Sequence, residues 1–229
     1  SKEFITKDNI DYLFNNNYDF IVDACDTVTT KVLLIKYAKL NNIPFIYLGE
    51  YEGPSNINTI TLDNNKVGLI AGNYMVNFHH ATKIIYAGFE DVYESNIRYE
   101  AFYKTAKNLN PKIDIKKING RDNFEKNLLD YISEGYLNFF CFNDQLCYRT
   151  LAYLNKSIPD ARSIFPKLHI VGVDALSTKM EGLIDITSVD FDIDNISRAI
   201  IEIFKSAWQG NNEIKHVYIP VNLHKRNTN

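Results

Sequence analysis

Short runs of apolar residues alternate along the chain with longer stretches in which apolar residues recur every three or four positions. In the run 139–142 four consecutive apolar residues predict a strand buried on both faces, and helical spacing begins just after it at Leu146. Equivalent runs predict strands at 20–24, 43–48, 59–62, 83–86, 113–118, 169–173, 186–191 and 217–221. Helical spacing predicts helices at 27–40, 65–78, 96–109, 124–132, 145–154 and 193–208. This alternation is typical of βαβ crossovers and predicts an α/β fold with parallel sheets.

Length and composition are those of a globular protein. The 229 residues suffice for one large domain or for two lobes of roughly 100 to 120 residues. A net charge of -3 provides no basic field that would attract nucleic acid. The sequence contains no apolar run of about 18 residues and no leader pattern, so we expect a protein that neither spans a membrane nor carries a visible export signal.

Three cysteines are too few and too irregularly spaced for a disulfide framework or a zinc site. Cys141 and Cys147 lie in apolar surroundings and are predicted to be buried free thiols, which suits a reducing cytoplasm. Nucleotide-binding glycine loops and the serine- and zinc-hydrolase motifs are also absent from the sequence. We therefore expect no enzyme activity, no cofactor and no metal. The pair His79-His80 falls where a helix ends, so a surface or C-capping role is expected.

Four polar residues stand at the ends of predicted strands or just after them, namely Asp63, Arg98, Asn143 and Asp174. Open α/β sheets bind ligands beyond the carboxyl ends of their strands. Carboxylates and amides bond hydroxyl groups, and arginine presents a fixed fork of donors. If the four converge, they suit a small, polyhydroxylated ligand held in a cleft.

Each of these residues also has a purely structural interpretation. Asp63 and Asn143 are placed to cap the helices that follow them, a role worth about 1 kcal/mol. Arg98 is placed for a solvated side chain or a surface ion pair. Asp174 is placed to form a turn. The pattern alone leaves both interpretations open at every position.

An ordered series of motifs resembles the effector-binding domain of LacI-family bacterial transcription regulators, which have the periplasmic-binding-protein type I fold. The matching segments are IPFI at 43–46, TLDN at 61–64, KIIYAG at 83–88, RYEAF at 98–102, FCFND at 140–144, HIVGVD at 169–174, ITSV at 186–189 and IPVNLHKRNT at 219–228. Ala101 and Ser197 stand where the family has glycine. The resemblance extends over roughly residues 18–228, and its weight lies in the order of the motifs.

The resemblance implies two Rossmann-like lobes with parallel sheets, joined by a multi-strand hinge. Residues 1–88 and 190–210 would form the N-terminal lobe, and residues 89–189 and 211–229 the C-terminal lobe. It also implies that Arg98, Asn143 and Asp174 contact a ligand, that Asp63 lies near the pocket, and that Phe191 occupies a pocket position that is often polar. Phe191 would then stack on a sugar ring.

The resemblance further implies segments that this sequence does not include. Family members carry a DNA-binding headpiece, a hinge helix and a first β-α-β stretch before the strand matched by residues 20–24. We therefore expect a fragment whose first lobe is truncated at its N-terminus. Residues 19–46 alone also resemble a ThiF/MoeB-type adenylating enzyme, but the glycine-rich nucleotide loop of that family is not in the sequence, and this resemblance ends at Ile46.

Together these features predict a cytoplasmic effector-sensing domain that binds a sugar or a sugar phosphate, acts as a homodimer and reaches operator DNA only through a headpiece. A solute-binding protein of a sugar transporter is the alternative, and a fragment of an adenylating enzyme is the third possibility. We expect Arg98→Ala to abolish effector binding while folding stays nearly intact.

Overall fold

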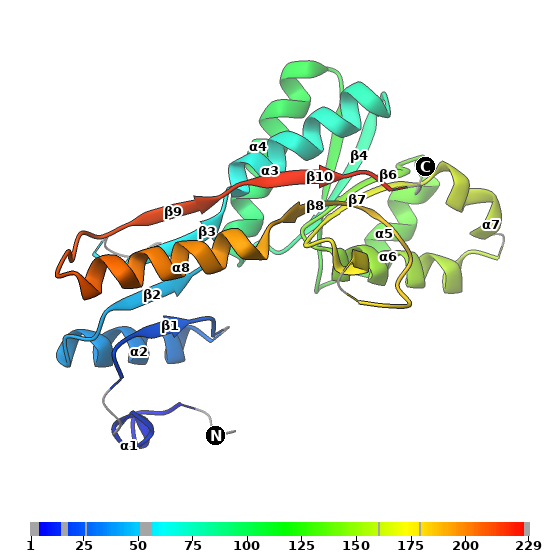
Figure 1. Cartoon of the computed structure of the whole chain (residues 1–229). Helices are drawn as coiled ribbons and strands as arrows, with labels where there is room; N and C mark the ends of the chain where they lie inside the picture. Colours follow the sequence, from blue (N-terminus) through cyan, green and yellow to red (C-terminus); the bar gives the residue numbers. More distant parts are fainter. Residues whose placement is uncertain are drawn as a thin grey trace. The chain divides into compact units, whose positions relative to one another are not determined.

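The structure, a computed structural model, describes residues 5–14, 18–25, 27–50, 56–159, 161–178 and 180–226. Backbone contacts divide the chain into two compact units, each with its own sheet. Unit 1 comprises Ser1–Leu62 and Asp192–Ile219, and unit 2 comprises Asp63–Phe191 and Pro220–Asn229. The chain passes from one unit to the other after Leu62, Phe191 and Ile219 (Figure 1).

Unit 1 is built on a parallel sheet in the order β1-β2-β3-β9. Its strands are β1 (Ile21–Asp23), β2 (Phe45–Leu48), β3 (Asn58–Leu62) and β9 (His216–Ile219). Its helices are α1 (Ile10–Leu13), α2 (Val28–Leu40) and α8 (Ile193–Trp208). Helix α2 packs on β1, while α8 packs on β3 and β9 (Figure 1).

Unit 2 is built on a larger sheet in the order β10-β8-β7-β6-β4-β5, in which only β10 is antiparallel to its neighbour. Its strands are β4 (Lys83–Gly88), β5 (Asp114–Asn119), β6 (Asn138–Cys141), β7 (His169–Val173), β8 (Thr187–Phe191) and β10 (Val221–His224). Its longer helices are α3 (Asn64–Asn73), α4 (Tyr93–Leu109), α5 (Phe124–Ser133) and α6 (Asp144–Ser157). Shorter helical segments are η1 (Tyr74–Phe78), α7 (Ala161–Ile164), η2 (Phe165–Lys167) and η3 (Leu176–Thr178).

The unit 2 sheet is covered on both faces, as the apolar run 139–142 predicts. Phe139 packs into a core with Leu146 and Leu154 of α6, whereas the next residue, Phe140, contacts the rings of Tyr86 and Phe102. Successive side chains of a strand point to opposite faces, so the two phenylalanines fill two separate layers. The predicted α/β class with mainly parallel sheets is confirmed.

The structure differs from the sequence pattern in the ends of several elements and in the grouping of one segment. The helix predicted at 65–78 ends as the π-helix η1. The strand predicted at 217–221 is two strands, β9 and β10, separated by Pro220, which has no N–H to give to a ladder. Residues 63–88, predicted to belong to the first lobe, group with unit 2 because β4 pairs with β5 and β6.

Several smaller expectations can be compared with the described residues. Cys141 and Cys147 are buried free thiols, as predicted. His79 is the C-cap residue of η1. No described helix is long and apolar enough to cross a bilayer. Within the same described ranges, no group of three or more histidine, cysteine, aspartate or glutamate side chains is arranged to hold a metal ion. Asn227 and Thr228, which end the last motif, lie outside the described residues.

Candidate functional site

The carboxyl ends of five parallel strands lie along one edge of the unit 2 sheet. In sheet order they are β8, β7, β6, β4 and β5. The predicted residues Phe191, Asp174 and Asn143 stand at or just beyond the first three of these ends. This is the edge at which open α/β sheets bind ligands, and we take it as the candidate site.

Arg98 is buried at this edge, with only 5% of its surface exposed. It projects from α4, and its Nε donates to Asn64 Oδ1 at the start of α3 over 2.7 Å. Its Nη1 donates to the Phe142 carbonyl oxygen over 2.6 Å, and its guanidinium lies 4.6 Å from the Phe142 ring centroid. Arg98 therefore joins three segments of unit 2 as a buried side chain, and the solvated side chain considered from the sequence is not what the structure shows.

A second guanidinium and a second ring extend this arrangement along the edge. The Phe89 ring meets the Phe142 ring edge to face, with centroids 5.6 Å apart. The guanidinium carbon of Arg121 lies 5.1 Å from the Phe89 centroid. Arginine side chains lie well over aromatic faces because the ring quadrupole attracts the cation. These four side chains contact one another in the order Arg98, Phe142, Phe89 and Arg121, and we call them the edge row.

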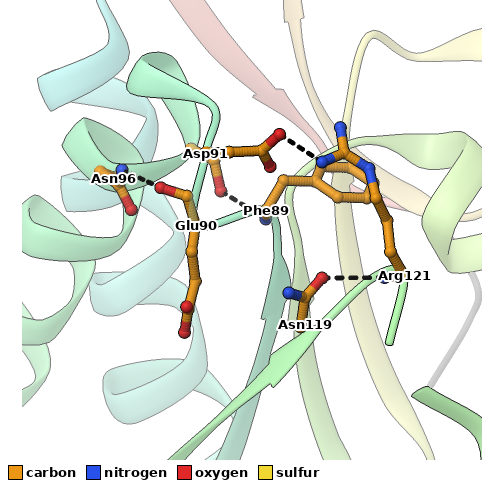
Figure 2. Close-up of polar contacts among 7 residues, drawn as sticks. Phe89, Glu90, Asp91, Asn96, Asn119 and Arg121 are labelled. Carbon is orange, nitrogen blue, oxygen red and sulfur yellow. Dashed lines mark hydrogen bonds and ion pairs between the residues drawn. The ribbon is translucent and has the colours of Figure 1, made fainter. Parts of the chain in front are cut away.

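The loops after β4 and β5 hold the outer end of the edge row. Figure 2 shows Arg121 paired with Asp91, and the Arg121 amide donating to Asn119 Oδ1 over 2.9 Å. On the other side of the loop Asn96 Nδ2 donates to the Glu90 carbonyl oxygen over 2.8 Å. The Arg121 guanidinium lowers the pKa of the Asp91 carboxyl. Both partners of the pair are largely exposed, so it contributes little to stability.

Asp63 and Asn143 are both helix caps. Asp63 Oδ1 accepts from the Lys66 amide over 2.8 Å at the start of α3. Asn143 Oδ1 accepts from the Leu146 amide over 3.0 Å at the start of α6. The capping interpretation is therefore confirmed for both residues. Because each side chain remains partly exposed, capping leaves room for a contact with a ligand.

Asp174 has an unusual backbone conformation. It directly follows β7, and its φ of +100° and that of +47° at Ala175 place two consecutive non-glycine residues in the left-handed region. The Asp174 amide donates to the Val189 carbonyl oxygen over 3.0 Å, which ties this turn to β8. Backbone strain of this kind costs about 1–3 kcal/mol per residue and gathers at functional sites. Asp174 is therefore both the turn former and a ligand candidate.

Phe191 ends β8, and its side chain is partly buried. It is paired in register with Val221 of β10. Phe191 thus lies on the same sheet edge as Asp174, at the end away from Phe89 and Arg121. Arg98 contacts Phe142, the residue before Asn143, and it also contacts Asn64, the residue after Asp63. Three of the five predicted residues, Asp63, Arg98 and Asn143, are therefore linked through their sequence neighbours.

The core beneath the edge holds two polar groups in their neutral forms. Burial raises the pKa of the Tyr86 hydroxyl, which donates to the Ser95 carbonyl oxygen over 2.7 Å. Burial also raises the pKa of the Cys147 thiol. A thiol with a raised pKa is a poor nucleophile, because the thiolate is the reactive form.

Solved structures with this fold were found at low sequence identity. A LacI family transcriptional regulator from Enterococcus faecium with bound ribose superposes with a TM-score of 0.73 at 20% identity, over 96% of this chain and 82% of that one. A periplasmic binding protein/LacI transcriptional regulator from Alkaliphilus metalliredigens, complexed with D-xylulofuranose, gives 0.67 at 19% identity, over 87% and 82%. The chain has the periplasmic-binding-protein-like fold found in LacI-family regulators. A dimeric Lac repressor is also similar, with a TM-score of 0.67 at 16% identity over 86% of this chain and 73% of that one.

Comparison of sequences alone finds a short match and no matching family. No protein-family model matches the chain. A tRNA threonylcarbamoyladenosine dehydratase from Haemophilus influenzae is 43% identical over 47 residues, which is 20% of this chain and 18% of that protein. The chain thus spans under one fifth of the length of this curated relative. So short a match does not account for the LacI-type fold of the remaining residues.

Sequence reasoning missed three members of the edge row and the residue that holds its fourth member. Phe89, Phe142 and Arg121 were not singled out, nor was Asn64, which accepts from Arg98. Phe142 reads as the last residue of a buried strand, but β6 ends at Cys141 and leaves Phe142 at the edge. Phe89 directly follows β4 and Arg121 follows β5, so their positions after strands were the only available signal.

Proposed function

We propose that this chain is the effector-sensing part of a LacI-type transcription regulator and that it binds a sugar or a sugar phosphate at the carboxyl edge of the unit 2 sheet. The observation that carries the proposal is Arg98, a buried guanidinium held at that edge by Asn64 and by the Phe142 carbonyl. A fixed arginine fork suits hydroxyl and phosphate oxygens.

The neighbours of Arg98 complete a surface of the right chemistry. Asn143 and Asp174 offer amide and carboxylate oxygens from partly exposed side chains. Phe142 and Phe191 present partly buried rings, whose faces suit the C–H surface of a sugar. The structures from Enterococcus faecium and Alkaliphilus metalliredigens, which hold ribose and D-xylulofuranose, support a sugar as the ligand class.

The proposed mechanism is a shift of population between conformations, without catalysis. The effector binds one arrangement of the domain better than another and so changes its population. In a regulator this change would alter how a pair of headpieces, supplied by segments outside this sequence, meets operator DNA. We propose a cytoplasmic homodimer for this purpose. The Lac repressor structure with the same fold is described as dimeric.

Calorimetric titration and thermal unfolding with D-ribose, D-xylulose and D-ribose 5-phosphate test the proposal. We expect heat with at least one of them and a rise in melting temperature that grows with its concentration, reaching about 2.7 kcal/mol of added stability at 100 times Kd. The absence of heat and of any thermal shift across the three sugars would contradict a sugar-sensing function.

A solute-binding protein of a sugar transporter is the second candidate, because the same fold is described for a protein named both periplasmic binding protein and regulator. Reading the codons upstream of this sequence separates the two functions. A helix-turn-helix there supports the regulator, and an export leader supports the transporter.

An adenylating enzyme is the third candidate, favoured by the 47-residue match to the Haemophilus influenzae dehydratase. It predicts ATP–pyrophosphate exchange by the purified chain. We expect no exchange, since the chain superposes over 96% of its length on a LacI family transcriptional regulator.

A further inference from the structure

Asp144 is a buried carboxylate to which the proposed site gives no direct role. It is the first residue of α6, next to the cap Asn143, and none of its surface is exposed. Burial of a carboxylate costs folding free energy unless hydrogen bonds compensate it, so its hydrogen-bond partners indicate its structural role.

Those partners lie on the turn after β7 and on β8. Asp144 Oδ2 accepts from the Leu176 amide over 2.7 Å, and Oδ1 accepts from the Ser188 hydroxyl over 2.7 Å. Ser188 Oγ in turn accepts from the Ala175 amide over 3.0 Å. Two successive amides of the turn are thus held by one carboxylate and one hydroxyl, both buried.

These two amides belong to the strained turn that carries Asp174. Residues 174 and 175 both have positive φ, a conformation that persists only where surrounding contacts impose it. The site is fitted closely to the carboxylate, because a Cβ built on Gly172 of β7 would lie 2.0 Å from Asp144 Oδ1. Only glycine at position 172 leaves space for this carboxylate.

We propose that Asp144, acting through Ser188, is a positioning residue that holds the 174–176 turn in its left-handed form and so fixes the Asp174 carboxylate at the ligand edge. The positioning role is a property of the fold, whereas its effect on affinity rests on the proposed function. The two parts are therefore tested by separate measurements.

Amide hydrogen exchange, followed by NMR on the full chain, tests the positioning part without any ligand. In Asp144→Ala we expect the Ala175 and Leu176 amides to exchange at least tenfold faster relative to the β6 amides. In Ser188→Ala we expect the same acceleration of exchange at the Ala175 amide. This second variant provides the test if Asp144→Ala does not fold. Thr150→Ala is the matched control, because Thr150 is buried on the same helix and its hydroxyl bonds only the Leu146 carbonyl among the contacts described.

Unchanged exchange at Ala175 and Leu176 in these variants would overturn the positioning role. Equal acceleration in Thr150→Ala would overturn it as well, since the effect would then be general loss of stability. Either result can be obtained whether or not a sugar binds.

Titration of whichever of D-ribose, D-xylulose and D-ribose 5-phosphate the wild type binds most tightly into wild type, Asp144→Ala, Asp174→Asn and the double variant tests the effect on affinity. We expect Asp144→Ala to weaken binding at least tenfold and the double variant to bind no more weakly than Asp174→Asn, because a carboxylate that is absent needs no positioning. Additive losses would overturn that part of the proposal. No binding by the wild type to any of the sugars would instead count against the proposed function.

Discussion

Arg98 supports the fold and is also the central candidate for ligand binding, and the sequence does not separate these roles. Its buried guanidinium bonds Asn64 and the Phe142 carbonyl, which belong to different segments of unit 2. Removal of the side chain leaves these two acceptors without that donor. The expectation that Arg98→Ala leaves folding nearly intact is therefore revised.

We expect Arg98→Ala to lose about 1–3 kcal/mol of unfolding free energy and to lose sugar binding. Arg98→Lys keeps the charge without the planar fork, so it should recover stability more fully than affinity. Urea unfolding and calorimetric titration of both variants provide the comparison. Wild-type affinity in a folded Arg98→Ala variant would show that the residue is structural only.

Local chemistry at the other site residues was predictable to different degrees. The caps at Asp63 and Asn143 follow from residue type and position alone, and the structure confirms both. The contacts of Asp144 with Ser188 and Leu176 join positions 44 and 32 residues apart in the sequence. Spacing along one chain does not predict such contacts, which depend on the order of strands in the sheet.

At the scale of elements, the close approach of α3 and α4 places Asn64 beside Arg98. A Cβ on Gly68 of α3 would lie 2.3 Å from the Arg98 carbonyl oxygen of α4, a backbone atom with little freedom to move. On Gly72, one turn later, the nearest atoms would be side-chain carbons of Thr105 at 3.0 Å. Glycine at position 68 therefore allows the two helices to pack closely.

We expect Gly68→Ala to destabilise unit 2 by about 3 kcal/mol or more, because inserting a methyl group here overpacks a backbone contact. Gly72→Ala is the control on the same helix and should cost clearly less, since its methyl group would meet the Thr105 side chain at 3.0 Å and the Phe102 carbonyl oxygen at 3.2 Å, against 2.3 Å at Gly68. Chemical denaturation measures both. Equal stability of the two variants would contradict the close approach at Gly68.

The π-helix η1 was predicted as ordinary helix, because periodicity over five residues does not distinguish the two. Its C-cap residue is His79, whose ring meets the Tyr74 and Phe78 rings edge to face, with centroids 4.7 and 5.0 Å apart. The His79 ring also lies 4.0 Å from that of His169 at the start of β7. Burial, followed by the charges of His169, His80 and Lys225, lowers the pKa of His79 to about 4.

This lowered pKa gives the stability a defined pH dependence. The unfolded chain takes up the proton near pH 6.5 and the folded one only near pH 4, so the His79 contribution is complete above pH 6.5 and is lost as the pH falls toward 4. Because the ring is partly exposed, we expect a loss of about 1 kcal/mol. His79→Phe keeps a ring against Tyr74 and should flatten the curve between pH 4 and 6.5. Identical curves for the two proteins would refute the assignment.

At the scale of the whole molecule, the order of strands and helices was readable from the sequence, whereas the division into units was not. The predicted boundary at Gly88 follows two series of similar length, but hydrogen bonding places β4 between β5 and β6. Strand order depends on contacts between segments that are distant in the sequence, and the spacing of apolar residues does not predict which strands pair.

The proposed homodimer makes a prediction at this scale. Light scattering should give twice the chain mass of 26.4 kDa. A monomeric wild type at high concentration would contradict the dimer.

The most direct test of the central claim is a crystal structure of this chain grown with the sugar that binds most tightly in the titration. The account predicts that the sugar lies at the carboxyl edge of the unit 2 sheet, with oxygen atoms within hydrogen-bond distance of Arg98, Asn143 and Asp174. A sugar bound elsewhere on the chain, with these three side chains more than a hydrogen bond away from it, would contradict the account.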